Sequence, residues 1–365
     1  MRTVGVEEEL LLVDPRTGEP CALSTAVLAA AARESRGRAH AFTKELQGQQ
    51  LEFATYPQTG MKELGAEIER RRAEAARHAA EAGAAVAALA TSPLPAGPAL
   101  TEGDRYRWIQ RQFGLTALEQ LTCGCHVHVS VESDEEGVGV LDRIRPWLSV
   151  LLALSTNSPF WQGYDSAYSS YRSRVWGRWP SAGPVEVFGS AHRYHQQVRD
   201  LLATGILHDE GMIYFDARLS RHYPTVEVRA ADVCLDASTT VLLATLTRGL
   251  VDTAAREWRE GEPPGRHGVG LLRAAAWRAA RSGLDDELIH PLTMRPAPAD
   301  RVVHALLGHI EQALDDNGDL AHARQGIAEL LAGGNGARVQ RELLRRTGSL
   351  RDVVAACVRR TQEGR

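Results

Sequence analysis

The sequence predicts an α+β fold: an antiparallel or mixed sheet with one polar face, helices on its other face, and a helical C-terminal region. Two observations lead to this prediction. Strand-like runs alternate with helical segments over residues 1–235, and several strands carry ionisable residues on one side only. Residues 236–365 have helical periodicity almost throughout and read as a packed layer of the same domain, so we expect one domain over residues 1–365.

The individual elements follow from local patterns. Apolar residues that alternate or are β-branched predict strands at 3–13, 39–46, 50–55, 122–131, 212–219 and 225–230. Apolar residues at helical spacing predict helices at 24–34, 61–82, 101–113, 138–154 and 191–202. Residues 84–90 are apolar and fit either a further strand or the end of the preceding helix. After residue 235, the stretches GEPPG, MRPAPAD and LAGGNG separate successive helices.

The composition argues against several classes of protein. A formal net charge of -4, without a basic cluster, argues against nucleic acid as a partner. No apolar run approaches the roughly 20 residues that span a bilayer, and MRTVGVEEE lacks the pattern of a signal peptide, so we expect a cytoplasmic protein without membrane contact. The five cysteines show no paired spacing and are expected to be reduced. Lys44 and Lys62 are the only lysines, and neither belongs to a P-loop.

Four strands share one polarity pattern. Because side chains of a strand alternate between its two faces, GVEEEL places Glu7 and Glu9 on one face and Glu8 on the other. QLEFAT, GCHVHVSV and TVEVRAAD likewise separate apolar from ionisable residues. One such strand alone is most often a surface strand, but these four carry no lysine and are rich in acids. Their polar faces hold Glu7, Glu9, Glu52, His126, His128, Glu227 and Arg229.

The polar faces indicate a cation site if the four strands share a sheet. Carboxylates that gather on one face repel one another, and cations make such a face stable. Carboxylates with one or two imidazoles suit Mg²⁺ or Mn²⁺, which leave coordination positions for phosphate oxygens. Arg229, on the same face, is suited to neutralise charge on a phosphoryl group during transfer. These residue types predict a metal-dependent nucleotide site without a P-loop.

Two alternatives remain open from the residues alone. His126 and His128 also fit a zinc-dependent hydrolase, although the neighbouring Cys125 points to the opposite face and no His-Glu-x-x-His helix accompanies them. A non-catalytic nucleotide- or metal-binding protein is the other alternative. Retained zinc with activity in the absence of ATP would identify the hydrolase, and a lack of ATP turnover would identify the binding protein.

Six motifs in order resemble the carboxylate-amine ligase family, also called glutamate-cysteine ligase type 2. They are GVEEELLLVDP, QLEFAT, CGCHVHVSV, ALSTNSPFWQG, SYRSRVWGRWPSAGP and TVEVRAADVC. That family is similar in fold to the glutamine synthetase catalytic domain. The resemblance therefore implies a curved, largely antiparallel sheet whose concave face holds ATP and Mg²⁺ ions, with helices on its other face.

The resemblance also implies roles for individual residues. Arg229 is expected to contact the phosphates and to act in catalysis together with Glu52. His128 is expected to contact the cofactor or to orient the substrate. The metal ligands implied by the resemblance are Glu7, Glu9, Glu52, His126 and Glu227. Glu8 faces the other way and is expected to be structural, paired with an arginine.

Residues 155–184 form a long segment rich in aromatic residues and arginine, which is uncommon unless the segment binds a ligand. One reading is an irregular, packed excursion with Trp176 and Trp179 in the core. The resemblance favours a substrate wall in which an arginine pairs with a substrate carboxylate and a tyrosine lines the pocket. The candidates for that wall are Arg172, Arg174, Tyr168 and Tyr171.

We therefore expect an ATP-dependent carboxylate-amine ligase that forms a γ-glutamyl-type amide through an acyl phosphate. Glutamate-cysteine ligase-like activity, at a high or a low rate, is the expected reaction, and both substrates are implied by the resemblance alone. The expected cofactors are ATP and Mg²⁺ or Mn²⁺. The expected partners are small-molecule amino acid substrates, with a homodimer as the candidate assembly.

Overall fold

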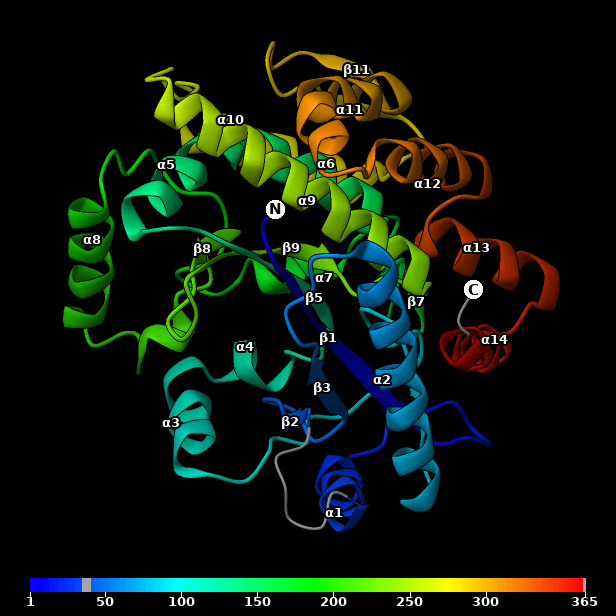
Figure 1. Cartoon of the computed structure of the whole chain (residues 1–365). Coiled ribbons are helices and arrows are strands. Elements are labelled where there is room, and N and C mark those ends of the chain that lie inside the picture. The colour runs from blue at the N-terminus through cyan, green and yellow to red at the C-terminus, as the bar shows by residue number, and fades with distance from the viewer. Residues whose placement is uncertain (35–40, 364–365) are drawn as a thin grey trace.

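A seven-stranded sheet, with every strand pair antiparallel, forms the centre of the computed structural model, which describes residues 1–34 and 41–363 (Figure 1). The strand order is β2-β3-β1-β5-β9-β8, and β4 pairs with the C-terminal part of β1. The strands are β1 (Val4–Val13), β2 (Phe42–Lys44), β3 (Gln50–Ala54), β4 (Ala85–Ala87), β5 (Gly124–Ser130), β8 (Ala217–Leu219) and β9 (Thr225–Asp232).

The helices fall into two series. Those between the strands are α1 (Ser24–Glu34), α2 (Met61–Glu81), α3 (Asp104–Phe113), α4 (Leu115–Leu118), α5 (Asp134–Ile144), α6 (Leu148–Ser155), α7 (Arg172–Trp176) and α8 (Ala191–Ala203). The C-terminal series is α9 (Ala237–Arg259), α10 (Val269–Ser282), α11 (Ala299–Asp316), α12 (Leu320–Gly333), α13 (Gly336–Thr347) and α14 (Leu350–Glu363). Two short hairpins join β6 (Phe160–Trp161) to β7 (Tyr164–Asp165) and β10 (Glu287–Ile289) to β11 (Pro296–Pro298).

The helix predicted at 138–154 differs from the structure at its start and in its middle. It begins earlier, at Asp134, because the Ser133 side chain accepts a hydrogen bond from the amide of Glu136 and caps the helix. A 3-10 turn over Arg145–Trp147 divides it into α5 and α6. Pro146 lies in that turn, where its missing amide hydrogen interrupts the α-helical hydrogen bonds.

Three other regions also differ from the sequence-based expectation. The strand expected at 212–219 shortens to β8, because residues 210–212 form a 3-10 turn. β10 lies in a region expected to be helical, whereas β11 lies within MRPAPAD, a stretch expected to separate two helices, where Pro296 and Pro298 disfavour a helix. Residues 84–90, which fitted either a strand or the end of the preceding helix, contain the strand β4. Residues 39 and 40 of the strand expected at 39–46 lie outside the described residues, and the rest of it contains β2.

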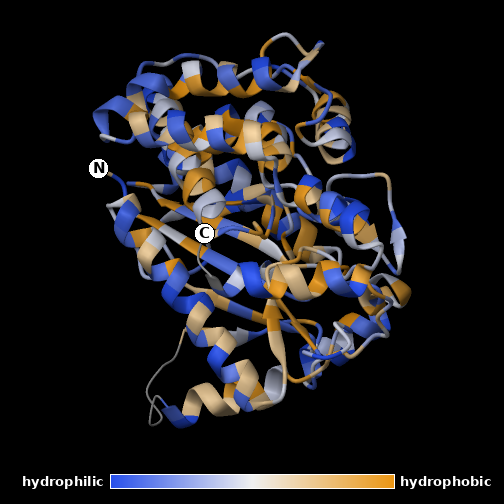
Figure 2. Cartoon of the chain, turned by 90° about the vertical axis from the view of Figure 1, so that its right-hand side faces the viewer, coloured by the Kyte–Doolittle hydropathy of each residue, from blue (hydrophilic) through white to orange (hydrophobic). Residues whose placement is uncertain are grey.

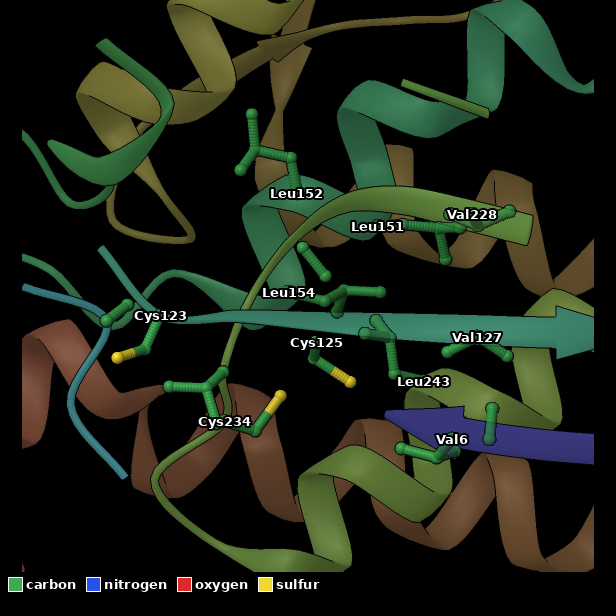
Figure 3. Close-up of a cluster of buried hydrophobic side chains, with 14 of the residues drawn as sticks. Val6, Cys123, Cys125, Val127, Leu151, Leu152, Leu154, Val228, Cys234 and Leu243 are labelled. Carbon is green, nitrogen blue, oxygen red and sulfur yellow. The ribbon is translucent and has the colours of Figure 1, made fainter. Parts of the chain in front are cut away.

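Helices cover the apolar face of the sheet. α9 contacts β1 and β5, with α2 and α5 beside it, and α6 contacts β9. Figure 3 shows Val6, Val127 and Val228, from three neighbouring strands, gathered with Leu243 of α9 and Leu151 of α6. All five side chains are buried. The apolar side of each strand therefore packs on helices, which leaves the polar side free to form a site.

The C-terminal helices add to the same core. α11 and α12 pack on α9, and α14 contacts β4 and α2. Figure 2 shows hydrophobic and hydrophilic residues alternating along these helices, and one cluster of buried apolar residues extends from Val4 to Cys357. Asn157 joins the layers, since its side chain donates to the carbonyl of Ala88 and accepts from Gln340. No helix within residues 1–34 and 41–363 is long and apolar enough to cross a bilayer.

Glu8 is the charged residue of β1 that faces the helices. It is fully buried, and its carboxylate accepts two hydrogen bonds of 2.8 Å from Arg72 of α2 and one of 2.6 Å from Thr240 of α9. Arg72 also donates to the carbonyls of Cys234 and Leu235. The expected pairing of Glu8 with an arginine is thus confirmed, and the pair links the sheet to two helices.

We expect Glu8→Gln to lower the free energy of unfolding by about 3 kcal/mol, because Arg72 is left as a buried charge without its partner. The matched control is Glu34→Gln, which removes an exposed ion pair with Arg77 and is expected to cost at most about 1 kcal/mol. Urea unfolding of both variants measures the difference. Equally small losses would show that the buried pair does not anchor the sheet.

Candidate metal and nucleotide site

The polar face of the sheet brings together the ionisable residues that the strand patterns predict. The cross-strand pairs on this face are Glu9 with Glu52, Glu7 with His126, and His128 with Glu227. Arg229 lies on the same face and its guanidinium contacts Glu227. Strands far apart in the sequence therefore contribute to one site, as their alternation indicates.

Three groups of side chains on this face offer ligand atoms close enough together to hold a cation. Within each group the ligand atoms lie within 4.8 Å of one another. The groups are Glu7–His128–Glu227, Glu7–Glu52–His126 and Glu9–Glu45–Glu52. Glu7 and Glu52 each belong to two groups, so the three groups form a continuous row across the sheet, which we call the carboxylate row. Its donor sets fit Mg²⁺ or Mn²⁺.

Three carboxylates meet at one end of the carboxylate row. Burial, followed by the neighbouring Glu45 carboxylate, raises the pKa of Glu9 to about 7. Burial and repulsion from Glu45, Glu7 and Glu9 raise the pKa of Glu52 well above its ordinary value. The amide of Gly124 donates to Glu9 over 2.6 Å and offsets part of this repulsion. Without a cation, this end of the row therefore holds protons near neutral pH.

Glu7 sits between two imidazoles. Its Oε2 lies 3.2 Å from Nδ1 of His126, and its Oε1 lies 3.4 Å from Nε2 of His128. Burial opposes ionisation of Glu7, but these contacts outweigh it and hold its pKa well below the ordinary value. Burial and the charge of Arg229 lower the pKa of His126 to about 4, so its imidazole is neutral and able to bind a cation. Burial also acts on His128, but Glu7 and Glu227 outweigh it and raise the pKa of His128.

Glu227 is held by two arginines. The Arg229 guanidinium contacts its Oε1, and the Nε of Arg218 donates to its Oε2 over 2.8 Å. Burial favours the neutral acid, but the two guanidinium groups outweigh it and hold the pKa of Glu227 well below the ordinary value. The guanidinium carbon of Arg229 lies 5.9 Å from the ring centre of Trp176. Arg229 is thus a buried cation fixed beside the carboxylate row.

Three cavities meet along this face and form one trough. The first, of about 220 Å³, contains the Glu9 end of the row. The second, of about 640 Å³, extends past Glu227. The third, of about 550 Å³, has a more apolar wall that includes Tyr56 and Tyr223. Glu7 lines all three, so a ligand that occupies one cavity reaches the row from that end.

The two arginines expected in a substrate wall lie at different places. Arg172 is buried against Gly124 of β5, where a Cβ on Gly124 would lie 2.3 Å from its Nη2. Its Nη1 is 3.8 Å from Asp232. Arg174 does not line the trough; together with Arg172 it lines a separate cavity of about 130 Å³. The charge of Arg172 nevertheless acts to lower the pKa of Glu9 at the end of the carboxylate row, and the role of both arginines in substrate binding stays a prediction.

The aromatic residues of this segment divide between packing and the trough. Tyr171 packs against Trp161 and Tyr168, with ring centres 5.6 and 6.0 Å away. It lines none of the cavities described above, so this geometry gives no support to its predicted contact with substrate. Trp176 and Trp179 line the trough, and Trp179 is also buried. This segment therefore contributes both to the packed core and to the wall of the trough.

The geometry argues against the zinc alternative. His126 and His128 belong to different groups of glutamates, and Cys125 is buried on the opposite face of β5. Burial raises the pKa of the Cys125 thiol well above its ordinary value, which opposes the thiolate that zinc requires. In the part of the chain that the structure describes, none of the groups suited to a cation contains a cysteine.

Glu45, Arg218 and Arg105 are charged residues of the trough that were not predicted from the sequence. Glu45 follows β2 directly, and strict alternation along the expected strand 39–46 could have put it on the face of Glu52. Arg218 is the cross-strand neighbour of Glu227, a pairing that only the register of β8 reveals. Arg105 belongs to α3, and no sequence pattern marks it.

We expect Mg²⁺ to stabilise the protein more at about pH 8 than at about pH 6, because below a pKa of about 7 the cation must displace a proton from Glu9. The same raised pKa makes the metal-free protein less stable as pH rises through this range, since the unfolded chain releases that proton at lower pH. Thermal unfolding with and without Mg²⁺ at both pH values measures both effects. Glu45→Gln removes the repulsion and should weaken the pH dependence; an equal Mg²⁺ effect at both pH values would contradict this account.

Comparison with known proteins identifies the family. The model described as "Glutamate-cysteine ligase family 2 (GCS2)" matches residues 3–356. The chain is 68% identical over 362 residues to "Putative glutamate--cysteine ligase 2-1" of Streptomyces avermitilis, with 99% of this chain and 100% of that protein covered. It is 50% identical over 365 residues to a protein of the same name from Paenarthrobacter aurescens, with 99% and 95% covered.

A solved structure shares the fold. The crystal structure of glutamate-cysteine ligase from Francisella tularensis, in complex with AMP, matches with a TM-score of 0.73 and 13% identity, over 99% of this chain and 88% of that chain. This likeness concerns the fold and confirms the α+β architecture with a helical C-terminal region. The family match over nearly the whole length, together with the two close relatives, shows that the chain belongs to glutamate-cysteine ligase family 2.

Proposed function

We propose that this member of the family is an ATP-dependent carboxylate-amine ligase that activates a carboxylate as an acyl phosphate and joins it to an amine. The observation that carries the proposal is the carboxylate row with Arg229 beside it. Phosphoryl transfer depends on positioning and charge neutralisation more than on an acid-base pair, and this face offers both. Glu7, Glu9, Glu52, His126 and Glu227 would hold Mg²⁺ or Mn²⁺, which would supply positive charge against the phosphates.

The apolar end of the trough is suited to the nucleotide. Tyr56 and Tyr223 line the cavity of about 550 Å³ and are 67% and 64% exposed, so their rings are free to stack on a base. His128 meets Tyr223 edge to face, with ring centres 6.4 Å apart, where this cavity reaches the carboxylate row. We assign ATP to this end, with its phosphates directed toward Glu7.

The opposite end is suited to the carboxylate substrate. Its volume of about 220 Å³ is below the roughly 300 Å³ at which pockets for drug-sized ligands begin. Arg105 and Arg218 line it; each already pairs with a carboxylate of the protein, Asp209 and Glu227 respectively, and each keeps further N–H groups that can bind a substrate carboxylate. Burial raises the pKa of Tyr106 to about 12, so its hydroxyl stays a hydrogen-bond donor. An amino acid fits this cavity in size, and bound cations would offset the glutamates in the same wall.

Arg229 and Glu52 have the central roles in the proposed reaction. Arg229 contacts Glu227, which is itself a proposed cation ligand. Its guanidinium is suited to bind an oxygen of the transferring phosphoryl group. Glu52 belongs to two of the three groups and would be a ligand in both. The protein's own residues would thus orient the phosphates.

Glutamate and cysteine are the proposed substrates, because relatives that are 68% and 50% identical carry the name of glutamate-cysteine ligases. The γ-carboxylate of glutamate would be activated and the amine of cysteine would displace phosphate. Partners of this size fit the trough. The cytoplasmic location and the homodimer remain predictions from the sequence.

We expect the protein to release ADP and phosphate in a Mg²⁺-dependent reaction that glutamate and an amine substrate stimulate. The test is incubation with ATP, Mg²⁺ and a panel of amino acids, followed by mass spectrometry of the nucleotides and of new amides. Glu52→Gln is expected to remove turnover while the protein stays folded, because it loses a ligand shared by two cations. Formation of AMP and pyrophosphate would overturn the acyl-phosphate route.

We expect Arg229→Lys to fold normally and to lose about 10³-fold in turnover, because lysine keeps the charge but not the planar fork that binds two phosphate oxygens. Arg77→Lys, at an exposed ion pair, is the matched control and should keep full activity. Turnover and thermal stability are measured on the same preparations. Near-normal turnover in Arg229→Lys would make Arg229 a structural partner of Glu227 only.

A further inference from the structure

The second cavity of the trough has no ligand in the proposed reaction. It is the largest of the three, at about 640 Å³ against about 550 and 220 Å³. It shares Gly211 and Arg218 with the cavity assigned to the carboxylate substrate, and His128 and Tyr223 with the cavity assigned to ATP. An amine that attacks an acyl phosphate has to reach the place where these two ligands meet, and the second cavity opens onto both.

This cavity extends along the polar face to the edge of the sheet. Its wall includes residues of β1, β5, β9 and β8, which are neighbours in that order, and then of α8 (Figure 1). α8 lies beside the edge strand, since the amide of Leu219 in β8 donates to the hydroxyl of Tyr194 over 3.1 Å. The three steps from β1 to β8 cover roughly 14 Å, and one extended residue covers at most about 3.6 Å. Cysteine therefore fills only part of this cavity, whereas a short peptide spans it.

Two arginines at the far end of the cavity lack acidic partners. Arg199 lies on α8 and Arg221 lies between β8 and β9, and both line the cavity. In the part of the chain that the structure describes, neither forms an ion pair, and the guanidinium of Arg199 donates only to the side-chain oxygen of Gln196, over 2.7 Å. Arg218 in the same wall is, by contrast, paired with Glu227. Arg199 and Arg221 are therefore available to bind an anion.

An acid lies at the opposite end of the cavity, next to the place of the carboxylate substrate. Glu210 lines the second cavity and directly precedes Gly211, which lines both. Among the described residues, the Glu210 carboxylate has no ion pair, whereas Asp134 in the same wall is paired with His195 over 2.7 Å. A carboxylate at this end is suited to hold the ammonium group of an amine before it reacts.

We propose that the second cavity binds the amine substrate and takes amines longer than cysteine that carry an anionic group, a carboxylate or a phosphate ester, at the end remote from the reacting nitrogen. A dipeptide has this pattern, with its ammonium at Glu210 and its terminal carboxylate at Arg199 and Arg221. The inference rests on the proposed function, which supplies the acyl phosphate.

The bonds formed and broken are those of amide formation. The ammonium first loses one proton to water. The neutral nitrogen then forms a bond to the acyl carbon, and the bond from that carbon to the phosphate oxygen breaks. Phosphate leaves with the bonding electron pair and takes up the second proton from nitrogen.

The first test is binding without turnover. Isothermal titration of the full-length protein, with Mg²⁺ and without ATP, compares alanyl-alanine with alanyl-alaninamide, which has the same length but no terminal charge. Cysteine and aminobutyl phosphate are the other probes. We expect alanyl-alanine to bind about tenfold more tightly than its amide, because the amide loses a charge-assisted hydrogen bond.

Arginine variants locate the binding. Arg199→Gln and Arg221→Gln are each expected to remove most of the difference between alanyl-alanine and its amide. Both side chains are exposed, so their replacement leaves folding intact. Arg193→Gln, at an exposed position of the same helix but outside the cavity wall, is the matched control and should bind like the wild type.

The titration also separates the two anionic groups. Tighter binding of alanyl-alanine than of aminobutyl phosphate identifies a carboxylate site, and the reverse order identifies a site for a phosphate ester. The proposal is overturned if neither anionic probe binds more tightly than alanyl-alaninamide. It is also overturned if Arg199→Gln and Arg221→Gln leave the binding unchanged.

A competition between amines separates this inference from the proposed function. With ATP, Mg²⁺ and glutamate present, cysteine and alanyl-alanine compete for the same acyl phosphate, and mass spectrometry measures the ratio of the two amides. We expect Arg221→Gln to shift this ratio toward the cysteine product about tenfold, with the KM for ATP unchanged. Formation of the cysteine product alone would support the proposed function and overturn this inference. If no amide forms with any amine, the proposed function fails, and the titration alone decides whether the cavity binds such amines.

Discussion

Repulsion among carboxylates on one face of the sheet is the constraint on which the rest of this molecule depends. The antiparallel register of β1 and β3 puts Glu9 directly opposite Glu52, an arrangement that is unfavourable in any sheet without a counter-charge. The fold tolerates it because its stability comes from the other face, where α2, α5, α6 and α9 bury the apolar side chains. The site is thus a locally unfavourable arrangement of charges supported by a well-packed core. A bound cation would relieve the repulsion between the carboxylates, and this relief would favour cation binding.

Charged groups behind the sheet support this arrangement. Glu8 and Arg72 join β1 to two helices, and Asp232 accepts hydrogen bonds from the segment that leads to α7. At the Glu8–Arg72 pair and at Asp232, several hydrogen-bond partners fix the orientation of a charged group at once. This use of planar cations agrees with a chain in which Lys44 and Lys62 are the only lysines.

The strands and the members of the carboxylate row were predictable wherever one local rule applied. Alternation along β1, β3, β5 and β9 was enough to put Glu7, Glu52, His126 and Glu227 on one face, because the side-chain period of a strand does not depend on its neighbours. The rest depends on tertiary contacts. Arg218 becomes part of the site only through the register of β8, and Arg172 lies against Gly124 because no side chain fills that space. The lengths of α5 and α6 similarly depend on the Ser133 cap and on Pro146, which act only locally and leave the apolar periodicity of the sequence unchanged.

Shared ligands have a thermodynamic consequence for this site. Glu7 serves two of the three groups, and Glu52 also serves two. A cation that fixes the orientation and ionisation of a shared carboxylate also prepares it for the next cation, while adding its own charge to the repulsion that the second must meet. Occupancies of neighbouring positions are therefore coupled, with a sign set by the balance of these two effects. Metal titrations of this enzyme will report macroscopic constants of the whole row, not separate affinities of individual sites.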